Sequence, residues 1–156
     1  MMNPPLFAST NLLFDVLWTH ATSTLALYGF TVVYLCLTLA IVSQRTVLTI
    51  TGKRKANDFP PTGEGESAFT HRLVRAHANM VEAFPFWGLL LLAIATNQNE
   101  VTDGLALVCL GARIAQVITH QISTSELGVK IRFVFFLTQL GIFGYWLVGF
   151  GTVWFT

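Results

Sequence analysis

Four long apolar runs alternate with shorter polar segments along the chain. They cover residues 22–43, 73–96, 101–122 and 133–156. Each run is close to the roughly 20 residues that a helix needs to cross a bilayer. Continuous runs of this length favour helices over the shorter, alternating segments of a membrane β-barrel. The pattern predicts one all-α domain over residues 1–156, an integral membrane four-helix bundle that is antiparallel and left-handed.

The polar connections predict how the bundle lies in the membrane. Residues 44–70 form a long polar loop, in which Ser67 is a plausible N-cap, and residues 97–103 and 121–130 form two hairpins. Eight of the nine Lys and Arg residues lie in or beside the first and third connections: Arg45, Lys53, Arg54, Lys55, Arg72, Arg75, Lys130 and Arg132. The positive-inside rule therefore predicts that these connections are cytosolic and that both termini are on the opposite side.

Composition supports a membrane protein and excludes several other classes. The chain is 53% hydrophobic and only 11% charged, against roughly 25% charged residues in soluble domains. A net charge of +1 without a basic stripe on a soluble face gives no reason to expect a nucleic-acid partner. Cys36 and Cys109 lie inside apolar runs and are interpreted as small buried hydrophobes. No tight Cys/His cluster suggests a metal.

The second apolar run carries unusual polar residues for a membrane span. Arg72, Arg75, Asn79, Glu82 and Phe86 recur at helical spacing and share one face of the predicted helix. Charges that enter the hydrocarbon region are expensive unless they meet partners or a polar ligand. This face is therefore expected to point into the bundle.

The third apolar run supplies a matching polar face. Arg113, Gln116 and His120 share one side of an antiparallel helix, so each falls at about the depth of a polar residue of the second run. Glu82 and Arg113 would both lie roughly 15 Å deep, at a helical rise of 1.5 Å per residue, and are expected to form an ion pair. One interpretation is that the sole role of this pair is to fix the register of the two helices. The excess of arginines at the cytosolic level instead suits an anionic ligand with carboxylates.

The stretch from Arg75 to Pro85, RAHANMVEAFP, resembles the second-helix signature of the MAPEG family, the membrane-associated proteins in eicosanoid and glutathione metabolism. That signature has an arginine, then an asparagine, a glutamate three residues later and a proline three residues after that. The rest of the chain is similar in outline, with four spans, a long basic first loop, an arginine in the third span and an arginine at the start of the fourth.

The resemblance implies a homotrimer that binds glutathione between neighbouring subunits near the cytosolic face, and no metal. Arg132 matches the fourth-helix arginine assigned to thiolate activation. The positions implied to hold glutathione are Arg45, Arg75, Asn79, Glu82, Arg113, Gln116 and His120. The implied function is a bacterial-type microsomal glutathione transferase of the inner membrane, with or without peroxidase activity, that acts on lipophilic electrophiles.

Four positions depart from the prostaglandin E synthase branch of that family. Gln116 and His120 stand where that branch has a histidine and a tyrosine, and Phe133 and Phe136 stand where it has a serine and a tyrosine. These changes remove hydroxyls that could hold a thiol, which argues against a specific eicosanoid activity. They also keep open an alternative: a non-catalytic membrane protein of the same fold that binds an anionic lipid or amphiphile at its cytosolic arginines.

Overall fold

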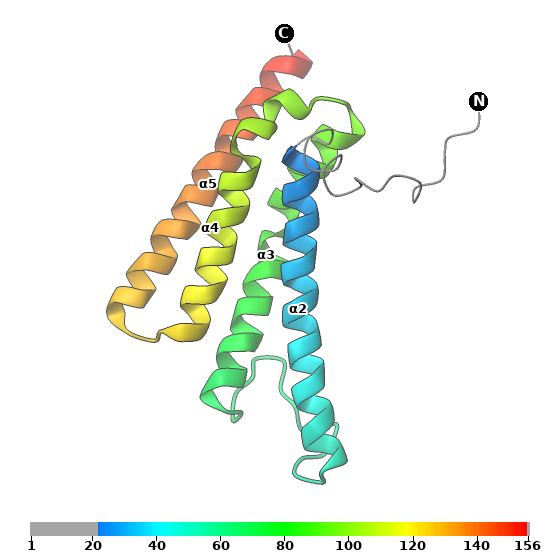
Figure 1. Cartoon of the computed structure of the whole chain (residues 1–156), viewed down its shortest axis with the longest axis vertical. Helices are drawn as coiled ribbons and strands as arrows, with labels where there is room; N and C mark the ends of the chain where they lie inside the picture. Colours follow the sequence, from blue (N-terminus) through cyan, green and yellow to red (C-terminus); the bar gives the residue numbers. More distant parts are fainter. Residues whose placement is uncertain (1–21, 156) are drawn as a thin grey trace, which may run out of the picture.

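The computed structural model describes residues 22–155, and the regular secondary structure of this part of the chain is helical throughout (Figure 1). Four long helices run up and down in turn, so consecutive helices are antiparallel. Each is long and apolar enough to span a membrane. The elements are α2 (Thr22–Ile50), α3 (Ala68–Ala95), the short 3₁₀ helix η1 (Asn99–Val101), α4 (Asp103–Ile122) and α5 (Glu126–Phe155). The predicted location of the N-terminus falls outside the described residues.

Helix α2 extends to Ile50, well beyond the predicted end of the first span at residue 43. It ends where Gly52 adopts a left-handed conformation with φ of 68°. The N–H groups of Gly52 and Lys53 then bond back to the carbonyls of Thr49 and Leu48, which is the Schellman arrangement that ends many helices. The first connection is therefore residues 51–67, shorter than the predicted loop 44–70.

Helix α5 also begins earlier than predicted, at Glu126 instead of residue 133. The hydroxyl of Ser125 accepts a hydrogen bond of 3.1 Å from the backbone N–H of Gly128, which caps the first turn. Arg132, which was predicted to lie at the start of the fourth span, consequently lies in the second turn of α5. The predicted cap of α3 is confirmed, since the Ser67 side chain accepts from the N–H of Thr70.

A polar cluster joins α2 and α4 at the end of the bundle opposite the 51–67 connection. The carboxylate of Asp103 accepts hydrogen bonds from the backbone N–H of Ser23, at 2.9 Å, and from its hydroxyl, at 2.6 Å. The Ser23 hydroxyl also lies 2.6 Å from that of Thr102. Asp103 therefore caps the start of α2 from a different helix and fixes the two helices in register.

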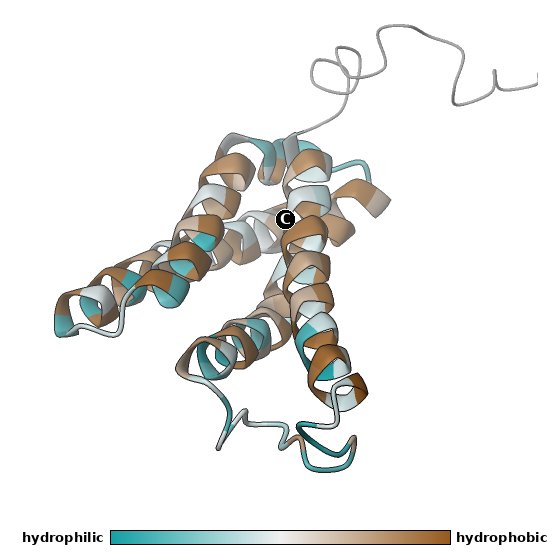
Figure 2. Ribbon diagram, turned by 60° about the horizontal axis from the view of Figure 1, so that its bottom comes forward, coloured by the Kyte–Doolittle hydropathy of each residue, from teal (hydrophilic) through white to brown (hydrophobic). Residues whose placement is uncertain are grey.

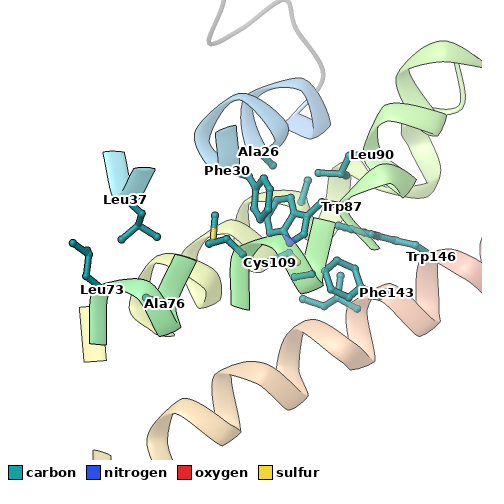
Figure 3. Close-up of a cluster of buried hydrophobic side chains, with 14 residues drawn as sticks. Ala26, Phe30, Leu37, Leu73, Ala76, Trp87, Leu90, Cys109, Phe143 and Trp146 are labelled. Atoms are coloured by element: carbon teal, nitrogen blue, oxygen red, sulfur yellow. The ribbon is translucent and has the colours of Figure 1, made fainter. Parts of the chain in front are cut away.

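An aromatic core holds all four helices together nearer that same end (Figure 3). Phe30 of α2 stacks on Trp87 of α3 with ring centroids 4.4 Å apart, and Trp87 meets the edge of Phe143 of α5 at 6.1 Å. Cys109 of α4 is fully buried in this cluster. Cys36, which was predicted to be buried as well, is exposed on the apolar outer surface, where lipid can cover a small thiol.

The outer surface of the four helices is apolar along most of its length, and hydrophilic residues gather at the connections and helix ends (Figure 2). Large side chains such as Leu39, Phe84, Val108 and Leu147 are more than half exposed. Toward the end that carries the 51–67 connection, the α4–α5 pair diverges from the α2–α3 pair (Figures 1 and 2). This divergence positions the candidate site.

Candidate functional site

A cavity of about 500 Å³ lies between α3, α4 and α5 in the diverging half of the bundle. This size falls within the roughly 300–1,000 Å³ of typical small-molecule sites. We call it the α3–α5 cavity. It brings together six of the eight site residues predicted from the sequence: Asn79 and Glu82 from α3, Arg113, Gln116 and His120 from α4, and Arg132 from α5.

Arg113 is almost completely buried in the cavity wall, since only 2% of the residue is exposed. Its Nη1 donates to Oε1 of Gln116, one turn further along α4, at 3.1 Å. The same oxygen accepts a second hydrogen bond of 3.0 Å from Nε2 of Gln139 on α5. Three side chains from two helices therefore form one hydrogen-bonded chain that runs across the cavity.

Arg132 is held by a second contact between α4 and α5. Its Nη1 donates a short hydrogen bond to Nδ1 of His120, and both side chains line the α3–α5 cavity. A guanidinium has only donors, so the histidine nitrogen must be the acceptor. No carboxylate lies within ion-pair distance of Arg113 or Arg132 in residues 22–155. Within the described residues, the cavity therefore presents two guanidinium groups that form no ion pair, although the Glu82 carboxylate lines the same cavity.

Phenylalanine side chains line the remainder of the cavity. Phe86 of α3 stacks on Phe143 of α5 with centroids 5.4 Å apart, and Phe133 and Phe136 add two more rings from α5. Phe133 and Phe136 are 57% and 43% exposed, so they lie at the outer, exposed boundary of the cavity. The cavity combines a cationic polar part with an apolar part that reaches the hydrocarbon region.

The predicted ion pair between Glu82 and Arg113 does not form in the described structure. Both residues line the cavity, but the Arg113 guanidinium bonds to Gln116 on its own helix, and Glu82 is exposed on α3. The divergence of α3 from α4 and α5 keeps the carboxylate and the guanidinium apart. The two residues lie at matching depths and line the same cavity, as predicted, but they do not form an ion pair.

Arg45 and Arg75, the other two predicted site residues, do not line this cavity. Arg45 bonds to the Pro60 carbonyl at 3.1 Å, pairs with the carboxylate of Glu66 at 3.4 Å and lies over the ring of Phe59. These contacts fasten the 51–67 connection to the end of α2. Arg75 is exposed on α3.

Gln139 is the polar residue of the cavity that the sequence analysis did not single out. The fourth apolar run was examined for charges, and a neutral amide among phenylalanines gave no signal on that criterion. A better criterion is the presence of any amide inside an apolar span, because an amide in a membrane span needs hydrogen-bond partners whatever its charge. By that criterion Gln139 would have been grouped with Asn79 and Gln116.

Comparison with known protein families adds one match. A protein-family model described as "MAPEG family" matches residues 21–151. The chain belongs to the MAPEG family. No curated protein and no solved structure matches the chain in the corresponding searches. As a MAPEG protein with four helices that can span a bilayer, it is an integral, multi-pass membrane protein of a family that includes glutathione transferases and related proteins.

Proposed function

We propose that this MAPEG protein is a membrane-embedded glutathione transferase that joins glutathione to lipophilic electrophiles. The observation that carries the proposal is the composition of the α3–α5 cavity. Two guanidinium groups that form no ion pair within the described residues, those of Arg113 and Arg132, lie beside a boundary of exposed phenylalanines. Such a cavity suits a polar, anionic thiol at one end and a lipid-soluble acceptor at the other.

The arginines have separate roles in this proposal. Arg113, the more buried of the two, binds a carboxylate or carbonyl of the tripeptide by charge-assisted hydrogen bonds. Arg132 lies beside the sulfur and lowers the pKa of the thiol, which raises the fraction present as the nucleophilic thiolate. Asn79, Gln116 and His120 hold the rest of the peptide. Glu82 is exposed on α3 and is available to bind the ammonium group of glutathione.

The reaction is a substitution at carbon. The thiolate attacks the electrophilic carbon of the acceptor, a carbon–sulfur bond forms, and the bond to a leaving group such as chloride breaks. The proton released from the thiol passes to water. The acceptor dissolves in the bilayer and reaches the sulfur past Phe133 and Phe136. If the acceptor is a hydroperoxide, the thiolate attacks the terminal oxygen, the O–O bond breaks and an alcohol leaves. A second glutathione then reduces the resulting sulfenic acid, which gives glutathione disulfide and water.

The homotrimer implied by the sequence resemblance is part of the proposal. Arg45 and Arg75 do not line the cavity of their own chain, so any contact of theirs with glutathione would be made at a neighbouring subunit. The proposed orientation places the basic connections in the cytosol, where glutathione is abundant, and both termini on the opposite side.

One observation favours a second candidate function. The rings of Phe133 and Phe136 are exposed toward lipid directly beside the two arginines, an arrangement that also suits an anionic amphiphile with its chain in the bilayer. In that alternative the protein binds such a molecule without catalysis. The two candidates differ in whether the cavity binds glutathione.

The deciding experiment is turnover of glutathione with a chlorinated nitroaromatic acceptor by purified protein in detergent. Arg132→Ala should lower the rate about 10- to 100-fold, because a charge-assisted hydrogen bond to the thiolate is lost. Lys130→Ala is the matched control: Lys130 lies two residues away on the same helix, is exposed and, among residues 22–155, forms its ion pair with Glu126 on its own helix. Turnover that Arg132→Ala leaves unchanged would remove Arg132 from its role. No turnover and no glutathione binding by the wild-type protein would favour the amphiphile-binding alternative.

A further inference from the structure

Gln139 is 1% exposed in the middle of an apolar membrane helix, yet it lines the α3–α5 cavity. Both N–H groups of its amide find acceptors within the protein. Nε2 lies 3.0 Å from Oε1 of Gln116 and 2.9 Å from the carbonyl of Phe135, one turn earlier on α5. These contacts hold the amide in one place.

The orientation of the Gln139 amide follows from Arg113. An arginine has no acceptor, so the Gln116 atom that faces Nη1 of Arg113 must be the carbonyl oxygen. The same oxygen faces Gln139, which must therefore present its NH₂ group. An inverted Gln139 would place its oxygen against two other acceptors, those of Gln116 and Phe135. Arg113, through Gln116, thus determines which atom of the Gln139 amide is left without a hydrogen-bond partner.

That atom is Oε1. It is buried and has no hydrogen-bond partner among the described protein atoms, and the same is true of Nε of Arg113. Buried amide oxygens and guanidinium donors are usually satisfied. Gln139 and Arg113, which both line the cavity, therefore carry one unused acceptor and one unused donor, linked through Gln116. Protein atoms cover both of these atoms in the ligand-free structure, so a ligand contacts them only when the surrounding side chains move apart.

We propose that Gln139 determines ligand specificity in this cavity by selecting a ligand that contains an amide. Its Oε1 accepts the N–H of the ligand's amide, and Arg113 donates to a carbonyl or other acceptor of the same ligand. A carboxylate or ester offers only acceptors, which Oε1 of Gln139 repels. With the ligand identified as glutathione, an assignment that rests on the proposed function, the N–H belongs to one of its two peptide groups.

The first test needs no glutathione. N-dodecylacetamide and dodecyl acetate share a chain and a carbonyl, and differ in that the amide has an N–H where the ester has an oxygen. Thermal unfolding in detergent at increasing concentrations of each gives two apparent affinities. The wild-type protein should bind the amide about tenfold more tightly than the ester, the usual effect of one buried hydrogen bond. Equal affinity of the wild-type protein for the two compounds would overturn the proposal, and this comparison requires no variant to fold.

Variants then locate the preference. Gln139→Leu should reduce the ratio of amide to ester affinity to about one. Thr138→Val is the matched control, because Thr138 is the neighbouring residue on α5, is exposed and, within the described part of the chain, donates its hydroxyl to a carbonyl of its own helix. It should retain the ratio. If Gln139→Leu still binds the amide more tightly than the ester, another side chain causes the preference and the proposal is overturned.

Glutathione kinetics separate this inference from the proposed function. Gln139→Leu should raise KM for glutathione about tenfold and leave kcat within about twofold, since the lost contact binds the peptide and does not touch the sulfur. Unchanged KM in an active enzyme would refute the role of Gln139 while the transferase function stands. An amide preference in a protein that does not bind glutathione would support the role of Gln139 and reject the transferase.

Discussion

Arg132 of α5 donates a hydrogen bond to Nδ1 of His120, which lies twelve residues earlier in the chain on α4. Only the short connection of residues 123–125 separates these two helices, so the contact is built into a tight helical hairpin. The guanidinium thought to act on the thiol is thus oriented by the protein before any ligand binds. Pre-orientation of this kind lowers the cost of reaching the productive geometry.

Replacement of His120 should therefore act through Arg132. His120→Leu removes the acceptor, and we expect kcat with glutathione to fall about tenfold, the effect of one lost hydrogen bond. His120→Gln, which restores an acceptor on a side chain of similar reach, should recover part of that loss. Steady-state kinetics of the two variants provide the measurement. Equal losses in both variants would show that the imidazole acts on the ligand directly.

The absence of a Glu82–Arg113 ion pair predicts a small effect on stability. Glu82→Gln should change the melting temperature of the ligand-free protein by about 1 °C or less, as expected for a side chain without a charged partner. Breaking a buried ion pair would instead cost about 3–5 kcal/mol. Thermal unfolding in detergent distinguishes the two cases, and a large drop would mean that the pair forms in the membrane.

The interhelical cap formed by Asp103 should be important for stability. Asp103→Ala removes the acceptor for the backbone N–H and hydroxyl of Ser23, and we expect a loss of about 1–2 kcal/mol. This corresponds to a melting temperature lower by about 2–8 °C. Glu100→Ala is the control, because Glu100 is acidic, nearby and exposed. Equal melting temperatures for the two variants would contradict the capping role.

The left-handed conformation of Gly52 gives a test of where the first connection begins. Gly52→Ala should destabilise the protein by about 1–2 kcal/mol, because a Cβ is strained at φ of 68°. Gly104→Ala, in the first turn of α4 with open space around the position, should be neutral or slightly stabilising. If both variants melt at the wild-type temperature, α2 does not end as described.

Apolar run length sufficed to predict four helices, because membrane spans must be long and continuous. It could not set their ends. Helix α2 runs on to Ile50 because its end depends on Gly52, and α5 begins at Glu126 because Ser125 caps it. These are local backbone and hydrogen-bond effects that hydropathy does not record. The sequence therefore placed Arg132 at the border of a hairpin, whereas the structure places it inside a helix.

Helical periodicity also predicted which polar residues of α3 and α4 share a cavity. It could not predict their contacts, since contact depends on how far the helices diverge. Arg113 accordingly bonds to Gln116 and not to Glu82. The contribution of α5 was the least accessible to sequence reasoning, because Gln139 carries no charge and its partner Gln116 lies 23 residues away in the chain.

The central claim is that the α3–α5 cavity binds glutathione through Arg113 and Arg132. Calorimetric titration of glutathione into the detergent-solubilised protein tests it most directly, with Arg113→Leu as the site variant and Lys130→Ala as the control. The account predicts saturable binding by the wild-type protein and the control, and at least about tenfold weaker binding by Arg113→Leu. No binding at millimolar glutathione, or equal binding by all three proteins, would contradict it.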